Sequence, residues 1–189
     1  REHQSARVSS ARAFTPNERI PHKHAELSAT VFVDHFTDYV HVALMRDLSL
    51  DETLAKTSFE RLAGNGRVHI AAYRADSGRF ADKGFQDAVW ESNQKITFCA
   101  VGAHHQNSIV ERKIKDLTLT TRTLLLHAIC HCPSHITTMM WPFVLKEAAY
   151  RLNKLSIRLS FFNIDGDIID KSLFHTFGCP IFVLDLRLQ

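Results

Sequence analysis

The chain has 189 residues and a mass of 21.5 kDa, is 45% hydrophobic and 23% charged, and contains only 7 Gly and 5 Pro. This composition excludes a disordered, collagen-like or low-complexity protein and predicts a folded chain of about one domain. No apolar run approaches the roughly 18 residues that cross a bilayer, and the N-terminal region lacks the hydrophobic core of a signal peptide. The four irregularly spaced cysteines do not suit a disulfide scaffold. We therefore expect an intracellular, reducing location, without export or membrane insertion.

The net charge of +3 is unevenly distributed along the chain. Residues 107–158 carry eight basic and three acidic side chains, whereas residues 31–106 carry eight basic and ten acidic ones. A basic segment attracts a polyanion, and it is also compatible with an ordinary solvated helix face. Charge alone leaves both interpretations open.

The first half of the chain predicts strands alternating with helices. Residues 1–27 are polar, contain two prolines and lack periodicity, which predicts a loop or a frayed start. Residues 30–33 and 39–44 are β-branched and aromatic runs around a short polar connection, which predicts an antiparallel hairpin. The elements expected next are a helix from residue 51 to the glycines at 64 and 66, a strand over 68–73, a short helix over 85–93 and a strand over 96–101.

The second half is expected to be mainly helical. A long helix from about 107 to 131 ends before Pro133, and a further helix runs from Trp141 to Leu155 with Pro142 in its first turn. Residues 173–189 are expected to form short strands around a turn, and Trp90, Trp141 and Phe143 are expected in the core. This order of elements predicts an α/β fold in which a mixed sheet is flanked by helices.

Two carboxylates occupy positions that suit chemistry. Asp76 follows a predicted strand, and Glu111 lies near the start of the long helix, beside Arg112 and Lys113. Paired carboxylates that bind Mg²⁺ or Mn²⁺, with basic neighbours, are what two-metal phosphoryl transfer requires. The alternative is that Asp76 is a turn residue and Glu111 an acid favoured by the helix dipole.

Four stretches resemble the integrase core of copia-type LTR retrotransposons, in the same order, over about residues 28–189. They are residues 30–36 (TVFVDHF), 73–80 (YRADSGRF), 98–112 (FCAVGAHHQNSIVER) and 174–185 (FHTFGCPIFVLD). The resemblance implies a ribonuclease-H-like fold and a triad of two aspartates and a glutamate that binds Mg²⁺ or Mn²⁺. It also implies insertion of the element's cDNA into DNA. Asp76 and Glu111 match the second and third triad positions.

The resemblance also predicts domains, partners and location. It divides the chain into a poorly matched segment 1–27, a catalytic core 28–158 and a small β-rich segment 159–189 that leads toward reverse transcriptase. The implied partner is DNA, both the element ends and the target, with a homo-oligomer compatible and a nuclear location expected for a functional protein. The DNA contacts expected on the long helix are Arg112, Lys113, Lys115 and Arg122.

The chain departs from the family pattern at its first triad position. The first aspartate is expected about thirty residues before Asp34, where this sequence has His3-Gln4 in place of Asp-Gln. Asp34 and Asp38 are assigned to the hairpin and do not replace it. We therefore expect impaired strand transfer. The alternatives are a non-catalytic nucleic-acid-binding remnant of a transposable element, or a product without function.

A cluster of histidines and cysteines suggests zinc, with His127, Cys130, His131, Cys132 and His135 within nine residues. The spacing is poor for one tetrahedral ion, because Cys130 and Cys132 point apart on a helix. A zinc site is therefore not expected.

Overall fold

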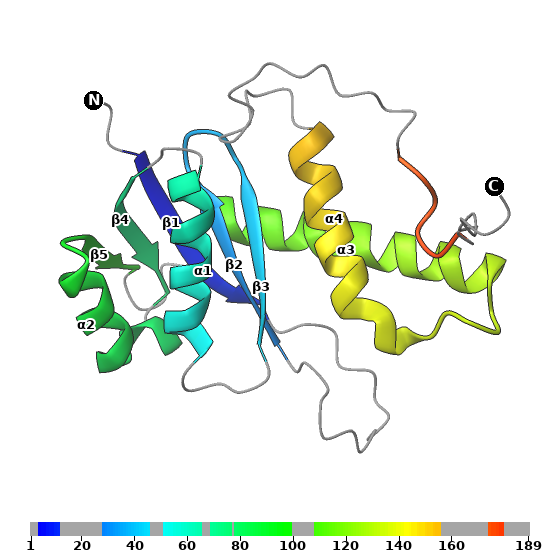
Figure 1. Cartoon of the computed structure of the whole chain (residues 1–189), viewed down its shortest axis with the longest axis horizontal. Helices are drawn as coiled ribbons and strands as arrows, with labels where there is room; N and C mark the ends of the chain where they lie inside the picture. Colours follow the sequence, from blue (N-terminus) through cyan, green and yellow to red (C-terminus); the bar gives the residue numbers. More distant parts are fainter. Residues whose placement is uncertain are drawn as a thin grey trace, which may run out of the picture.

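The computed structural model describes residues 4–11, 28–45, 51–65, 69–76, 78–99, 108–155 and 174–179. Its centre is a five-stranded sheet with the order β3-β2-β1-β4-β5 (Figure 1). The strands are β1 Gln4–Ala11, β2 Ser28–Asp34, β3 Val40–Met45, β4 Ile70–Ala75 and β5 Lys95–Phe98. β1, β2 and β3 pair antiparallel, whereas β4 runs parallel to both β1 and β5. This mixed sheet is the one that the order of elements predicts.

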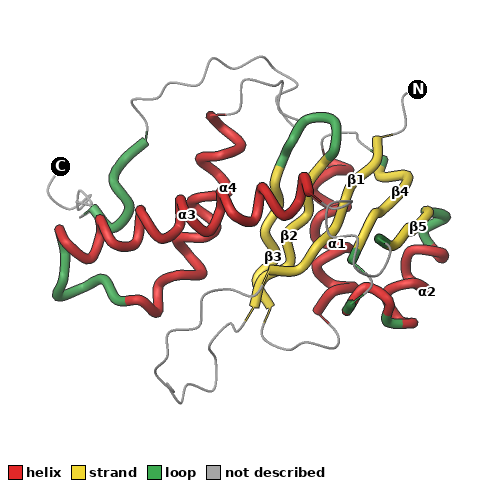
Figure 2. The backbone as a smooth tube through the Cα atoms, turned by 180° about the vertical axis from the view of Figure 1, so that it is seen from behind, coloured by secondary structure: helices red, strands yellow, loops and turns green. Residues whose placement is uncertain are grey.

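Helices pack on both faces of the sheet (Figures 1 and 2). α1, Asp51–Asn65, and α2, Lys83–Glu91, belong to one layer, and a 3-10 turn, η1, Arg79–Ala81, precedes α2. α3, Ser108–His131, and α4, Trp141–Leu155, pack against each other in the other layer, joined through η3, Thr138–Met140. Among the helices within the described ranges, none is both long and apolar enough to span a membrane.

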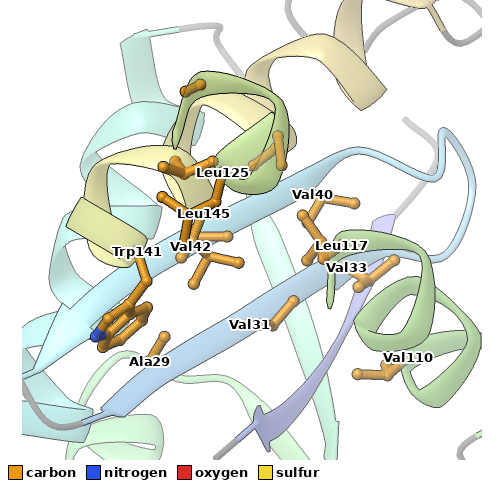
Figure 3. Packing of buried hydrophobic residues seen from close by; sticks show 14 of the residues in the cluster. Ala29, Val31, Val33, Val40, Val42, Val110, Leu117, Leu125, Trp141 and Leu145 are labelled. Carbon is orange, nitrogen blue, oxygen red and sulfur yellow. The ribbon is translucent and has the colours of Figure 1, made fainter. Parts of the chain in front are cut away.

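The side chains of β2 alternate between the two layers, as the period of a strand requires. Ala29, Val31 and Val33 join the apolar cluster against α3 and α4, which includes Leu117 and Trp141 (Figure 3). Phe32 points to the other face and stacks on Phe59 of α1, with ring centroids 4.9 Å apart. β2 is buried on both faces, which explains the consecutive apolar residues 31–33 at its centre.

An irregularity in β4 changes which residues face each layer. In the register with β1, Gln4 lies opposite Ile70 but Ser5 lies opposite Ala72, so Ala71 is an extra residue in β4. Such a bulge shifts the alternation of a strand by one position. Ile70, Tyr73 and Ala75 consequently all join the cluster against α1 and α2, although the first two are an odd number of residues apart.

The hairpin and the helices confirm the sequence prediction, whereas the N-terminal prediction was wrong. Residues 4–11, expected to be part of a loop, form β1, which lies between β2 and β4. This strand contains five Ser or Ala residues and a single Val, and its pairing on both sides supplies the order that composition does not. Backbone hydrogen bonding to two neighbours thus outweighs weak local propensity.

Two expected core residues are exposed. Trp90 is 74% and Phe143 65% exposed, whereas Trp141 is buried. The buried pair of α2 is Phe85 and Val89, one turn apart, and Trp90 lies outside that stripe. Phe143 lies outside the buried stripe of α4 in the same way. In the tail, residues 177–178 form the expected turn, with Gly178 at φ +78°, while the predicted strands beyond residue 179 and the boundary at 158 lie outside the described residues.

Candidate functional site

Asp76 directly follows β4 and is exposed. The backbone N–H of Cys99, the residue that follows β5, donates to the carbonyl of Ala75 at 3.0 Å and holds the last residue of β4 in place. Because Tyr73 and Ala75 face α1 and α2, strand alternation places residues 74 and 76 on the opposite face. Asp76 therefore lies on the side of the sheet that α3 covers.

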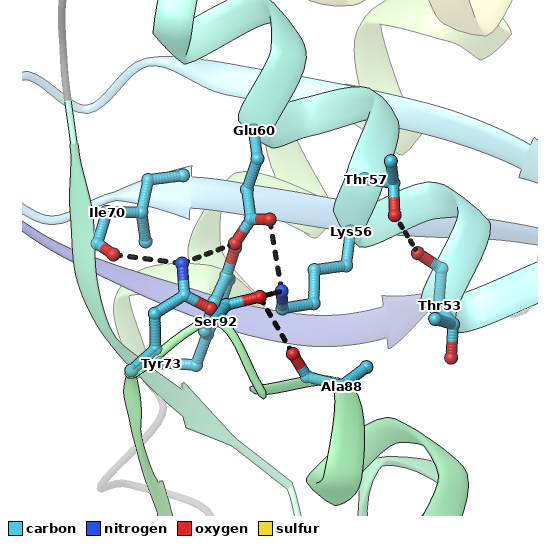
Figure 4. A network of polar contacts seen from close by, with 9 residues as sticks. Thr53, Lys56, Thr57, Glu60, Ile70, Tyr73, Ala88 and Ser92 are labelled. Atoms are coloured by element: carbon cyan, nitrogen blue, oxygen red, sulfur yellow. Dashed lines mark hydrogen bonds and ion pairs between the residues drawn. The ribbon is translucent and has the colours of Figure 1, made fainter. Parts of the chain in front are cut away.

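A polar network fixes β4 to the helices on its other side (Figure 4). The carboxylate of Glu60 on α1 accepts hydrogen bonds from the Tyr73 hydroxyl at 2.7 Å and from the Gln94 side-chain amide. The Lys56 ammonium lies 3.0 Å from the other Glu60 oxygen and donates to the Ser92 hydroxyl. The network thus joins α1, β4 and the segment that follows α2.

No pattern in the sequence predicted this network. Lys56 is 2% exposed, and Lys and Glu at i and i+4 are usually taken as a surface pair. Burial, together with the negative charge of Glu60 and its hydrogen bond, raises the pKa of Tyr73 far above its usual range. Tyr73 therefore stays a neutral donor, three residues before Asp76, and stabilises the strand that positions the carboxylate.

Glu111 lies in the first turn of α3 and is exposed. Its neighbour Val110 is fully buried in the cluster with Val31 and Val33, which fixes the start of the helix on the sheet. Two residues further on, the Lys113 ammonium lies 3.9 Å from the Asp38 carboxylate in the β2–β3 connection. Glu111 thus lies in α3 and Asp76 directly follows β4, and both of these elements contact β1.

Asp34 acts in the hairpin, as predicted. Its Oδ2 accepts hydrogen bonds from the backbone N–H of Thr37 at 2.8 Å and from the Thr37 hydroxyl at 2.6 Å. The side chain is 1% exposed, and the backbone of Asp38 has a positive φ of 61° in the turn. These bonds stabilise the turn between β2 and β3, and capping of nearby backbone groups is a usual function of aspartate in turns.

β1 is the strand next to β4, and it carries no carboxylate in its sequence QSARVSSA. Val8 lies opposite Ala75, so Ser9 is the β1 position level with Asp76. Within the described ranges, no group of three or more His, Cys, Asp or Glu side chains is placed to hold a metal ion. The donor set of Asp76 and Glu111 therefore does not fit a pair of bridged divalent ions, which needs further carboxylate oxygens.

The predicted basic residues of α3 differ in exposure. Arg112, Lys115 and Arg122 are exposed and lie within about 80° of one another around the helix axis. Lys113 is half-buried and is paired with Asp38, which separates it from that group. Leu119 and Leu126, 54% and 53% exposed, lie between and beyond the three cations on the same face. The face is therefore a mixed cationic and apolar stripe.

Known proteins resemble this chain in sequence and in fold. No family model matches the chain. A retrovirus-related Pol polyprotein from transposon RE1 of Arabidopsis thaliana is 27% identical over 161 residues, covering 80% of this chain. The chain spans only about a tenth of the length of that polyprotein.

Solved structures show the same architecture. The HTLV-2 integrase catalytic core domain in complex with magnesium matches with a TM-score of 0.55 and 19% identity, over 81% of this chain and 86% of that one. A chain in the simian T-cell lymphotropic virus intasome in complex with the PP2A regulatory subunit B56 gamma gives a TM-score of 0.62 and 16% identity, over 97% of this chain and 60% of that one. The fold is therefore the ribonuclease-H-like fold of integrase catalytic cores. In sequence the chain is thus similar to part of a retrotransposon Pol polyprotein, and in fold it is similar to integrase catalytic cores.

Proposed function

We propose that the chain is an integrase-type core for inserting retrotransposon cDNA into DNA, and that it lacks one of the acids needed for efficient strand transfer. The relatedness to a transposon polyprotein and the integrase-like fold support the first part. The absence of any acid from β1, the strand beside Asp76, supports the second. The composition of β1 is the observation that carries the proposal.

In this proposal Asp76 and Glu111 are the remaining metal-binding carboxylates. Both are exposed and come from elements that contact β1, which supports a shared site. Two carboxylates with water in the other positions suit one Mg²⁺ or Mn²⁺ ion, because hard divalent cations prefer oxygen ligands. Weak binding of a single ion leaves the attacking and leaving oxygens of a strand-transfer reaction without their second stabilising charge.

Restoring the missing acid tests the proposal. We compare joining of a labelled oligonucleotide end to plasmid DNA, with Mn²⁺, by the wild-type chain, His3→Asp and Ser9→Asp. His3 is the position that the family resemblance assigns to the first aspartate, and Ser9 is the position level with Asp76. We expect no joining by the wild type above the Asp76→Asn background, and joining by one of the two restored variants.

The controls separate the parts of the proposal. Ser10→Asp adds the same charge one residue further along β1, out of register with Asp76, and should not restore joining. Wild-type joining that Asp76→Asn abolishes would show that the site is complete and refute the impairment. Joining by neither restored variant, with DNA binding intact, would favour a non-catalytic remnant.

The second candidate function is binding of DNA without chemistry, and the exposed Arg112, Lys115 and Arg122 favour it. Three phosphate contacts predict that log affinity falls against log salt with a slope of about −3, or roughly 40-fold between 50 and 200 mM salt. Lys115→Glu/Arg122→Glu should weaken binding of a duplex and flatten this slope, as measured by fluorescence polarisation.

Lys113→Glu is the matched control, because its ammonium already lies beside Asp38 and should contribute less to duplex binding. Binding that is insensitive to salt, or equal losses in both variants, would contradict a DNA-contacting face on α3. In the proposed role the chain would act in the nucleus, as an oligomer bound to the element ends and to target DNA. Size-exclusion chromatography with light scattering tests whether the oligomer forms.

A further inference from the structure

A pair of histidines on α3 lies outside the proposed DNA face and outside the integrase site. His127 and His131 are one helical turn apart, both are exposed, and their Nε2 atoms are 3.0 Å apart. The ring centroids are 4.3 Å apart, so the two nitrogens approach each other more closely than the rings do. In the described part of the chain, each imidazole forms its hydrogen bond with the other, and no acid or backbone group engages either nitrogen.

The separation of the nitrogens has a definite meaning for metal coordination. Two imidazole nitrogens 3.0 Å apart, each about 2.05 Å from one ion, subtend roughly 94° at that ion. Neighbouring ligands near a right angle are usual for square-planar and octahedral Cu²⁺ and Ni²⁺, and both ions take imidazole ligands.

We propose that His127 and His131 form a two-histidine chelate for a divalent ion that takes imidazole ligands at right angles, Cu²⁺ or Ni²⁺. Water completes the coordination, because no third His, Cys, Asp or Glu in the described ranges is placed to join the pair. The 24-residue helix holds the two side chains in register, so binding requires little reordering of the backbone. Neutral imidazole is the ligand, and the hydrogen bond between the rings is broken when the ion enters.

Isothermal titration calorimetry of the full chain, with Ni²⁺ as the only added metal, tests the site. The wild type should bind one Ni²⁺, and His127→Gln and His131→Gln should each lower the affinity at least tenfold. His135→Gln is the matched control, since this exposed histidine follows the helix and bonds to the Ser134 hydroxyl at 2.6 Å. Its affinity should equal that of the wild type.

Two further measurements distinguish the histidine pair from the neighbouring thiols. Cys130→Ser/Cys132→Ser should retain Ni²⁺ binding, and loss of binding in this variant would overturn the proposal. In electron paramagnetic resonance of this double cysteine variant with Cu²⁺, nitrogen splittings should report two imidazoles, and one after His131→Gln. Equal Ni²⁺ affinity in the wild type and both histidine variants would also overturn it, and circular dichroism checks that each variant is folded.

Discussion

The two sides of the sheet are closed by different kinds of contact. Against α3 and α4 the buried cluster consists of aliphatic side chains and Trp141. Against α1 and α2 the aromatic cluster is accompanied by the polar network of Lys56, Glu60 and Tyr73. Apolar packing loses stability in proportion to the volume removed, whereas a buried ion pair fails when one partner is lost. The two sides should therefore respond differently to substitution and to pH.

The largest effect is expected on the polar side. Glu60→Ala leaves the Lys56 ammonium, with a side chain 3% exposed, without its carboxylate. Removing one partner of a buried pair costs about 3 to 5 kcal/mol of the free energy of unfolding, which chemical denaturation measures. Adding Lys56→Met should recover only the part of the loss that comes from the stranded charge, because the Tyr73 hydroxyl and the Gln94 amide still lack their acceptor.

Glu147→Ala is the matched control for this prediction. Glu147 also pairs with a cation at i+4, Arg151 at 2.7 Å, but both side chains are more exposed than Lys56. The expected loss is about 1 kcal/mol or less. Equal losses for Glu60→Ala and Glu147→Ala would show that burial of Lys56 does not increase the contribution of its ion pair to the free energy of unfolding.

A smaller loss is expected on the apolar side. Leu117→Ala removes a fully buried side chain of α3 that packs against the β2 valines. It should lower the free energy of unfolding by about 3 kcal/mol. Leu119→Ala, two residues away on the exposed stripe, should change the unfolding free energy by less than about 0.5 kcal/mol. A comparable loss in both variants would mean that the exposed stripe is covered by a partner in solution.

The smallest effect depends on pH. Burial, with the nearby positive charge of Lys146, lowers the pKa of His41 to about 4. Between pH 6.5 and 4 the unfolded chain binds a proton that the folded chain does not, so stability falls as the pH drops. The loss from pH 7 to pH 5 should be about 2 kcal/mol.

His41→Phe should remove this part of the pH dependence. The imidazole lies beside the stacked rings of Phe59 and Phe32, with centroids 5.5 and 6.1 Å away, and these aromatic neighbours suit a phenyl ring. Denaturation at pH 5 and 7 measures the difference, and His69→Gln, at an exposed position, is the control. If His41→Phe leaves the pH dependence unchanged, groups other than His41 cause the loss of stability at low pH.

Much of the fold followed from local patterns. The hairpin was predictable because β-branched runs flank a polar connection, and α3 and α4 because their apolar positions recur at helical spacing. β1 was not predictable, because a run of Ser and Ala has little strand propensity and is ordered by pairing with β2 and β4. The exposed Trp90 shows that an aromatic side chain next to a buried stripe need not join it.

The candidate site was predictable only in its parts. The positions of Asp76 after a strand and Glu111 in the first turn of a helix agree with the sequence, while their role as metal ligands remains a prediction. The pairing of Lys113 with Asp38 joins residues 75 positions apart, and no short-range pattern reveals it. The Lys56–Glu60 spacing was visible in the sequence, but its burial depends on tertiary packing.

The extra residue in β4 has a consequence for how this core can vary. With Ala71 present, Ile70 and Tyr73 point the same way, and Asp76 is directed to the side of α3. Deleting Ala71 would turn all residues of the strand on one side of the deletion to the opposite face of the sheet. Either Tyr73 would leave Glu60 or Ile70 would leave its cluster. Ala71 thus determines which face of the sheet its neighbours in β4 occupy. The fold should tolerate an insertion or deletion here only when a second one compensates for it.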